Sequence, residues 1–234
     1  MTELAQTRQA PPERSPHPGL VALVSLVLLV AGLVIAAAMS GGDALASPFG
    51  STADVTARIR ENHDAIRVLA FFQLGSAVPL GIYTATVYAR QLRLGVRVPG
   101  PVIGLVGGVL AITSLFAAAF ATYVESRPEV TGDAELTHAL AFLAFVAGGP
   151  AYAVGLGLLI AGAAVPGLLL RLVPRWVAAG GLVLAVLGEL AWLSMLAEPL
   201  QFLVPIVRFL GGVWLVLLGF RLPRDRHAVP TPSA

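Results

Sequence analysis

Arg208 is the one basic residue of the chain that sits deep inside a long apolar stretch. A charge at membrane depth is costly, so such a residue is a candidate for a functional site. The chain turns at Glu198, and Glu189 and Arg208 lie nine and ten residues from that position. At about 1.5 Å per residue, both side chains lie roughly 14 Å below the turn. The spacing therefore predicts that Glu189 and Arg208 face each other and pair.

Two interpretations of this pair are open. Gly212 and Gly219 share a helical face with Arg208, and small residues let helices approach closely, so Arg208 should face protein. In the structural interpretation, which we favour because structural ion pairs perturb charges as readily as sites do, the pair fixes helix register. In the functional interpretation, it lines a polar cavity or binds an ion or an anionic head group. Removing one partner is costly in either case.

Gln73 is a third polar residue at this depth, nine residues past Asp64 in another apolar stretch. It shares a helical face with Ser76 and Thr84, and it can join the pair if that face meets it. The interpretation that we favour is an interhelical hydrogen bond, worth about 0.6 to 2 kcal/mol. Gln73, Glu189 and Arg208 together form the candidate intramembrane polar cluster.

Histidine and carboxylate side chains also gather at the predicted outer surface. This second candidate cluster comprises His63, Asp64, Arg67, Glu135 and His138. Histidine nitrogens and carboxylate oxygens are zinc ligands. Their spacing is no metal motif, however, and His63 and Asp64 are as well explained by the start of a helix, where the dipole favours aspartate. We therefore expect no metal site.

Catalytic signatures are absent from the sequence. There is no HExxH motif, no GxSxG motif and no glycine-rich phosphate loop. His138 is the only histidine inside an apolar stretch, whereas a membrane haem needs facing histidines at mid-depth. The absence of cysteine excludes disulfides, thiolate metal sites and thiol nucleophiles. We expect no cofactor and no catalytic residue, so a non-enzyme is favoured.

The composition is that of a polytopic membrane protein. Hydrophobic residues make up 57% of the chain, charged residues 12%, and the mean hydropathy is +0.84. Crossing the hydrocarbon core takes about 20 apolar residues. Six stretches are long enough, namely Gly19 to Met39, Ala65 to Tyr88, Val102 to Tyr123, Leu136 to Ala161, Val177 to Leu196, and Phe202 to Leu222. The sequence predicts an all-α bundle of six transmembrane helices, kinked at Pro79 and Pro150.

The arginines predict the orientation of this bundle, because basic residues in short loops stay on the cytoplasmic side. Ten of them flank the same ends of the predicted spans, namely Arg8, Arg14, Arg90, Arg93, Arg97, Arg171, Arg175, Arg221, Arg224 and Arg226. Both termini should therefore be cytoplasmic. We expect one transmembrane domain over residues 19–224, with disordered tails at 1–18 and 225–234. Dispersed arginines also argue against a nucleic-acid partner, despite a pI of about 9.5.

Several segments from Asn62 onward carry a likeness to known sequences. They are Asn62-His63-Asp64-Ala65, the stretch from Phe71 to Tyr83, Gly148-Gly149-Pro150, the stretch from Leu172 to Trp176, and the stretch from Arg208 to Arg224. The chain thereby resembles a family of uncharacterised bacterial, chiefly actinobacterial, multi-pass membrane proteins. The resemblance implies a multi-pass topology in the bacterial inner membrane, and it implies no activity.

Three functions remain open. A membrane scaffold or accessory subunit ranks first, because the loops are short, the helical faces are rich in small residues, and catalytic motifs are missing. The alternative is a small transporter or channel with a polar site in the outer half of the membrane around Gln73, Glu189 and Arg208, which predicts a hydrated cavity. An enzyme acting on lipid would need converging titratable groups, which the sequence does not show. The expected partners are the lipid bilayer and another membrane protein or a second copy.

Overall fold

The computed structural model of the chain describes residues 16–41 and 48–224. It is all-helical, and the described residues contain no strand. The helices are α1 (Pro18–Met39), α2 (Thr52–Glu61), α3 (His63–Arg93), α4 (Gly100–Glu125), α5 (Ala134–Val146), the π-helical segment η1 (Ala147–Ala151), α6 (Tyr152–Leu169), α7 (Arg175–Leu190), the 3₁₀ segments η2 (Ala191–Met195) and η3 (Glu198–Phe202), and α8 (Leu203–Arg221).

Six helical stretches are long and apolar enough to cross a membrane, which confirms the predicted number. They are α1, α3, α4, the continuous rod of α5, η1 and α6, α7 with η2, and η3 with α8. The rod is longer than the predicted Leu136 to Ala161, because its helix runs from Ala134 to Leu169. Pro18, predicted to end a tail, begins α1, where its missing N–H is no loss. The predicted tails at 1–15 and 225–234 lie outside the described residues.

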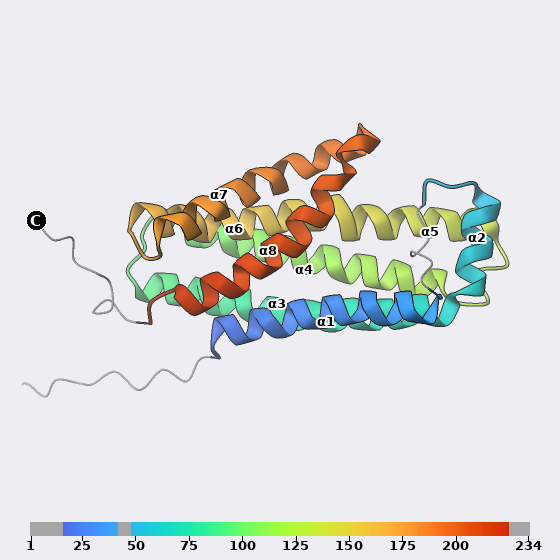
Figure 1. Cartoon of the computed structure of the whole chain (residues 1–234), viewed down its shortest axis with the longest axis horizontal. Helices are drawn as coiled ribbons and strands as arrows, with labels where there is room; N and C mark the ends of the chain where they lie inside the picture. Colours follow the sequence, from blue (N-terminus) through green and yellow to red (C-terminus); the bar gives the residue numbers. More distant parts are fainter. Residues whose placement is uncertain (1–15, 42–47, 225–234) are drawn as a thin grey trace, which may run out of the picture.

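The first turn of α1 and the last turn of α8 lie together at one end of the bundle, here called the inner end (Figure 1). Gly19 packs against Gly219 there, and the His17 ring lies 4.9 Å from the Phe220 ring. The connections from α3 to α4 and from α6 to α7 lie at the same end. The opposite end, here called the outer end, carries α2 and the connection from α4 to α5.

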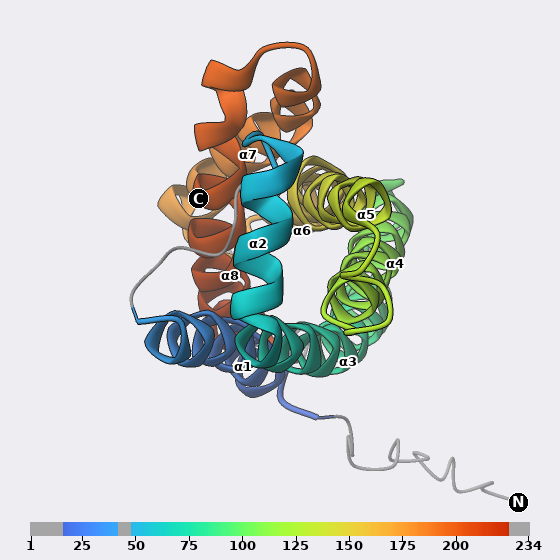
Figure 2. The same cartoon turned by 90° about the vertical axis from the view of Figure 1, so that its right-hand side faces the viewer.

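Neighbouring helices pack in a closed sequence. α1 contacts α3 and α8, α3 contacts α4, α4 contacts α6, and α6 contacts α7 and α8. Seen from the outer end, α1, α3, α4 and α5 curve around a centre that α2 crosses (Figure 2). The short helix α2 was not predicted, because it is polar on its outer face and too short to span a membrane.

Glycines set the close approach of α4 to α6 in the inner half. A Cβ on Gly162 would collide with the backbone of Gly104, and one on Gly107 with the backbone of Leu159. Gly155 meets Ala111 in the same way nearer the outer end. Without Cβ atoms the two backbones come into direct contact, which is how small residues hold membrane helices together. The small-residue faces of these helices are therefore used within the chain itself.

The rod of α5 and α6 changes its winding at Pro150, where the sequence predicted a kink. Pro150 has no N–H to donate, so a regular α-helix cannot continue through it without loss. The chain forms the π-helical segment η1 instead, and the N–H of Tyr152 bonds to the oxygen of Ala147. In an α-helix that N–H would bond to Gly148. The Gly148 oxygen is thereby left for another donor. α3, in contrast, runs unbroken through Pro79.

The hairpin of α7 and α8 stops short of the outer end of the bundle (Figure 1). α7 has 16 residues and α8 has 19, whereas α3 has 31. Figure 1 shows the hairpin crossing the bundle obliquely and ending before the outer end is reached. The outer half is thus enclosed mainly by α1, α3, α4 and α5, with α2 as its roof.

The roof helix α2 is capped at its first turn and packs against α3 and α5. The Ser51 hydroxyl accepts the N–H of Asp54 and so caps the first turn. Val55 and Ile59 are buried in a small apolar cluster that also contains Ile66 of α3 and Ala141 of α5. α2 therefore lies across the outer end, over the centre of the bundle (Figure 2).

Candidate functional site

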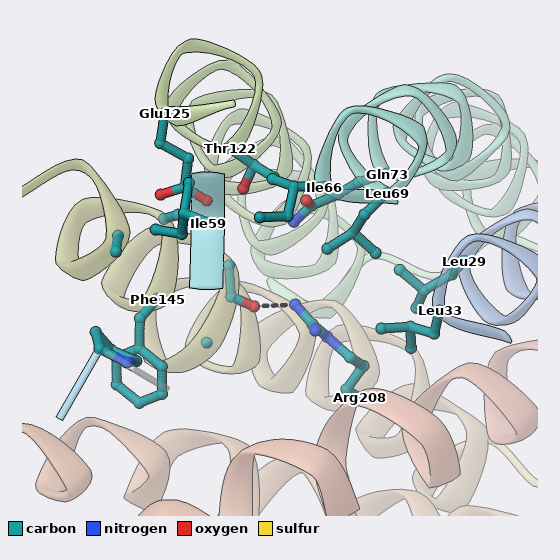
Figure 3. A pocket seen from close by; sticks show the side chains of 15 residues that line it. Leu29, Leu33, Ile59, Ile66, Leu69, Gln73, Thr122, Glu125, Phe145 and Arg208 are labelled. Atoms are coloured by element: carbon teal, nitrogen blue, oxygen red, sulfur yellow. Dashed lines mark hydrogen bonds between the residues drawn. The ribbon is translucent and has the colours of Figure 1, made fainter. Parts of the chain in front are cut away.

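A cavity of about 200 Å³ lies beneath α2 in the outer half of the bundle. Its walls come from α1, α3, α4, α5, η1 and α8, and Ile59 of α2 contributes to its roof. Four of its lining side chains are polar, namely Gln73, Thr122, Glu125 and Arg208. Figure 3 shows Arg208 on one side of the cavity and Glu125 on the other, with Gln73 between them along the wall.

Arg208 enters the cavity from α8, the oblique helix. One terminal N–H of its guanidinium donates to the Gly148 oxygen, which the π-helical winding leaves available (Figure 3). The guanidinium carbon lies 5.3 Å from the centre of the Tyr152 ring, a cation–π distance. Its Nε has no hydrogen-bond partner among the described residues. Arg208 is therefore held by Gly148 and Tyr152, while its Nε–H has no acceptor in the described structure.

Gln73 of α3 converges on the same point. Its amide nitrogen and an Arg208 terminal nitrogen would lie 3.1 Å and 3.5 Å from a Cβ built on Gly148. The absence of a side chain at Gly148 is thus what lets both polar groups lie against this residue. The structure brings Gln73 and Arg208 of the predicted cluster together, as their matching depths indicated.

Glu189 does not belong to this group, and the predicted pairing with Arg208 is wrong. No ion pair joins the two side chains in the described part of the chain. Glu189 lies instead against Gly157 of α6, 3.0 Å from where a Cβ would be, and its Oε1 has no hydrogen-bond partner there. Arg208 contacts Gly148 and Tyr152 instead, which lie nine and five residues before Gly157 on the same helical rod.

The reason for the error is the turn between α7 and α8. The prediction counted α-helical steps back and forward from Glu198. The chain there winds as two 3₁₀ segments, η2 and η3, which have three residues per turn and a longer rise. Both the depth and the direction of each side chain therefore differ from the α-helical count.

Glu125 is the cavity residue that sequence reasoning missed. The predicted third apolar stretch ends at Tyr123, two residues before it, but α4 continues to Glu125 itself. Its side chain is only 7% exposed, and Oε2 has no hydrogen-bond partner among the described residues. A signal was present: Ala118, Thr122 and Glu125 follow at helical spacing and so share one face.

The cavity therefore contains a carboxyl group and a guanidinium that do not bond to each other. Burying a charged group away from water without a full set of partners is costly. A bundle that only needed to pack would be more stable with apolar side chains at these positions. The arrangement suits a ligand that completes the hydrogen bonds of both groups.

The predicted outer-surface cluster separates into two parts. Asp64 forms an ion pair with Arg67 at 3.4 Å and lies 3.5 Å from His63, and all three are in the first turns of α3. His138 binds the roof instead: its Nδ1 lies 2.9 Å from the Thr52 hydroxyl, and its Nε2 lies 2.8 Å from the Pro48 oxygen. Since a carbonyl oxygen only accepts, Nε2 carries the proton.

Glu135, the fifth residue of that cluster, is exposed in the first turn of α5. Within the described ranges, no three histidine or carboxylate side chains come close enough to hold a metal ion. The outer-surface residues thus serve to start α3 and to fasten the roof.

Comparison with protein-family models, with curated proteins and with solved structures gave no match. The resemblance to a bacterial membrane-protein family therefore stays a prediction, and the function is inferred from the geometry of the cavity.

Proposed function

We propose that this chain is a multi-pass membrane protein that binds a small polar solute in the cavity formed by Gln73, Glu125 and Arg208, as a small transporter does. The observation that carries the proposal is a cavity lined by the Arg208 guanidinium and the buried Glu125 carboxyl group, with no ion pair between them. Charged residues inside membrane bundles usually mark substrate pathways. A cavity with apolar walls and a few convergent polar groups is the common form of a small-molecule site.

The floor of the cavity supports an outward-facing state. Arg208 separates it from a second void of only about 20 Å³, lined by Ser25, Tyr152 and Leu215 among others. Farther in, Leu156 and Ile160 are fully buried. A solute bound at Arg208 would be reached from the outer end and closed off from the inner one, as alternating access requires.

The accessory-subunit role loses its main support. It relied on small-residue faces available to a partner, and the glycines of α4 and α6 are packed against each other. The space beside Gly212 is likewise filled by Leu26 of α1, and the space beside Gly219 is filled by Gly19. Among the helical glycines, Gly75 and Gly180 have open space around them, which is too little to define a docking face.

The orientation and location follow the sequence analysis. We place the inner end in the cytoplasm, because Arg90, Arg93, Arg175 and Arg221 flank the helices at that end. The resemblance to bacterial proteins suggests the bacterial inner membrane. The cavity would then open toward the outer face of that membrane.

Cysteine labelling tests the proposal directly, because the chain has no native cysteine. Thr122→Cys and Ala144→Cys place single thiols on the cavity wall, and a membrane-impermeant thiol reagent should label both from the outer side. Ala153→Cys is the matched control, since it lies on the same helical rod as Ala144 and is 0% exposed. Absence of labelling at both cavity positions would show a dry cavity and would return the accessory role to first place.

A further inference from the structure

We infer that the solute is an extended zwitterion, with an anionic group held by Arg208 and Gln73 and an ammonium group held by Glu125. This inference rests on the proposed function and names the chemical class of its ligand. It starts from the charges of the cavity. Among the lining residues, Glu125 and Arg208 are the only ionisable ones. A purely anionic ligand would leave the Glu125 carboxyl group without a partner, and a purely cationic ligand would leave Arg208 without an anion.

The anionic end is assigned by the donors around Gly148. Arg208 has already given one terminal N–H to the Gly148 oxygen, and its Nε remains unpartnered in the described structure. The Gln73 amide lies beside it, so a second donor faces the same space. Carboxylates and phosphates, which accept several hydrogen bonds at once, fit a guanidinium in this situation.

The separation of the two charges follows from α4. Ala118 packs against Gly148, where Arg208 is anchored, with its Cβ 3.0 Å from a Cβ built there. Glu125 lies seven residues farther along the same helix, which is about 10 Å toward the outer end. Both side chains reach into the cavity and shorten this distance. A ligand that touches both must still carry its charges several bonds apart, unlike an α-amino acid.

The wall between the two charges is apolar. Ile66 and Leu69 of α3 face Phe145 of α5 across this part of the cavity. A short methylene chain between the charged ends would bury its surface there, at about 25 cal/mol per Å². An ω-amino carboxylate and a phosphoethanolamine group share this chemistry. The second of these occurs both as a free solute and as the head group of a phospholipid.

A chain-length series tests the inference with the full-length protein in phosphatidylglycerol nanodiscs, which contain no zwitterionic lipid. Glycine, 4-aminobutyrate, 6-aminohexanoate and phosphoethanolamine are the probes, with hexanoate as the singly charged control. The readouts are the thermal unfolding midpoint of the native chain and protection of Thr122→Cys from the thiol reagent. We expect protection by the longer zwitterions and phosphoethanolamine, with apparent affinities for glycine and hexanoate about tenfold or more weaker.

Two variants test which residue holds each charged end of the ligand. Glu125→Gln should remove the preference for a zwitterion over hexanoate, and Arg208→Lys should weaken every anionic probe while keeping the positive charge in place. Glu189→Gln is the control, because Glu189 lies outside the cavity wall, and it should leave the preference unchanged. Equal protection by hexanoate and 6-aminohexanoate in the native chain would overturn the inference.

Exchanging the nanodisc lipid distinguishes a free solute from a phospholipid head group as the ligand. If the free probes do not protect, the nanodisc lipid is exchanged for phosphatidylethanolamine. Protection that then appears and is lost in Glu125→Gln identifies the head group of a lipid as the zwitterion. If neither arm shows dependence on Glu125 although Thr122→Cys is labelled, the inference fails and the proposed function stands. If Thr122→Cys and Ala144→Cys are both unlabelled, both fail.

Discussion

The inner and outer halves of this bundle differ in whether their buried polar groups have hydrogen-bond partners. In the inner half, the Gln91 amide donates to the Gly162 oxygen at 3.1 Å, and the Trp214 indole donates to the Val177 oxygen at 2.8 Å. The Tyr83 hydroxyl and His17 Nδ1, which have no partner among the described residues, are exceptions. In the outer half, Arg208 and Glu125 both face a cavity and keep unpartnered atoms.

Backbone geometry explains the contrast. The inner half is closed by glycines that bring α4 and α6 into contact, so no space is left beside the polar groups. The outer half is opened by the π-helical turn at Pro150 and by a hairpin that ends early. Close packing stabilises one half, whereas the other half contains a cavity. Functional sites commonly carry a local loss of stability.

The largest effect is expected from filling the tight contact of the inner half. Gly162→Val would place side-chain carbons into the backbone of Gly104, and the helices would have to separate. We expect a loss of about 3 kcal/mol or more in the free energy of unfolding, or no folded protein. Gly180→Val is the matched control, because nothing lies within 4 Å of a Cβ there. Thermal unfolding in detergent measures both, and equal midpoints would refute the packing argument.

A smaller effect is expected from a side chain at the convergence point of the outer half. Gly148→Ala places a methyl group 3.0 Å from Ala118 Cβ and 3.1 Å from the Gln73 amide nitrogen. We expect about 1 to 2 kcal/mol of destabilisation and clearly reduced labelling at Thr122→Cys. Gly149→Ala is the control on the adjacent residue, where the nearest atom is at 3.6 Å. Indistinguishable behaviour of the two variants would show that Gly148 does not shape the cavity.

A near-zero coupling is expected between Glu189 and Arg208. Because no ion pair links them, the effects of Glu189→Gln and Arg208→Gln on the free energy of unfolding should add within about 0.5 kcal/mol. The double variant and both single variants are compared by denaturant unfolding. A coupling well above that limit would show that the two charges meet after all and that the halves are linked electrostatically.

The smallest effect concerns pH and the inner end. Burial lowers the pKa of His17 below 6.5, and Arg224 and Arg90 lower it further. The folded protein therefore holds this proton less tightly than the unfolded chain does, so the His17 contribution to stability is lost as pH falls from 6.5 toward the lowered pKa. Thermal unfolding from about pH 7.5 to about pH 5 should show a slightly steeper decline for the native chain than for His17→Gln. Identical slopes would show that His17 does not contribute to the pH dependence of stability.

The sequence predicted the class of fold well, because membrane insertion depends on length and apolar composition. The six stretches could be counted from the chain alone, and Arg208 stood out as a buried charge. Gln73 was predicted at the depth of Arg208, and both side chains line the same cavity, since α3 is a regular helix over that region. The prediction failed where the backbone departs from the α-helix, as at η2 and η3. It also failed where a helix extends beyond its apolar stretch, as α4 does at Glu125.

The sequence by itself determined that this chain forms six membrane-length helices and carries an intramembrane arginine. Both properties are local, because apolar length and the cost of a buried charge belong to a single segment. Only the tertiary structure decided which groups meet. Glu125 and Gln73, rather than Glu189, share the cavity with Arg208 because helix contacts and the π-helical turn set the rotation and depth of each side chain. Those quantities depend on neighbouring helices, and no single helix specifies them.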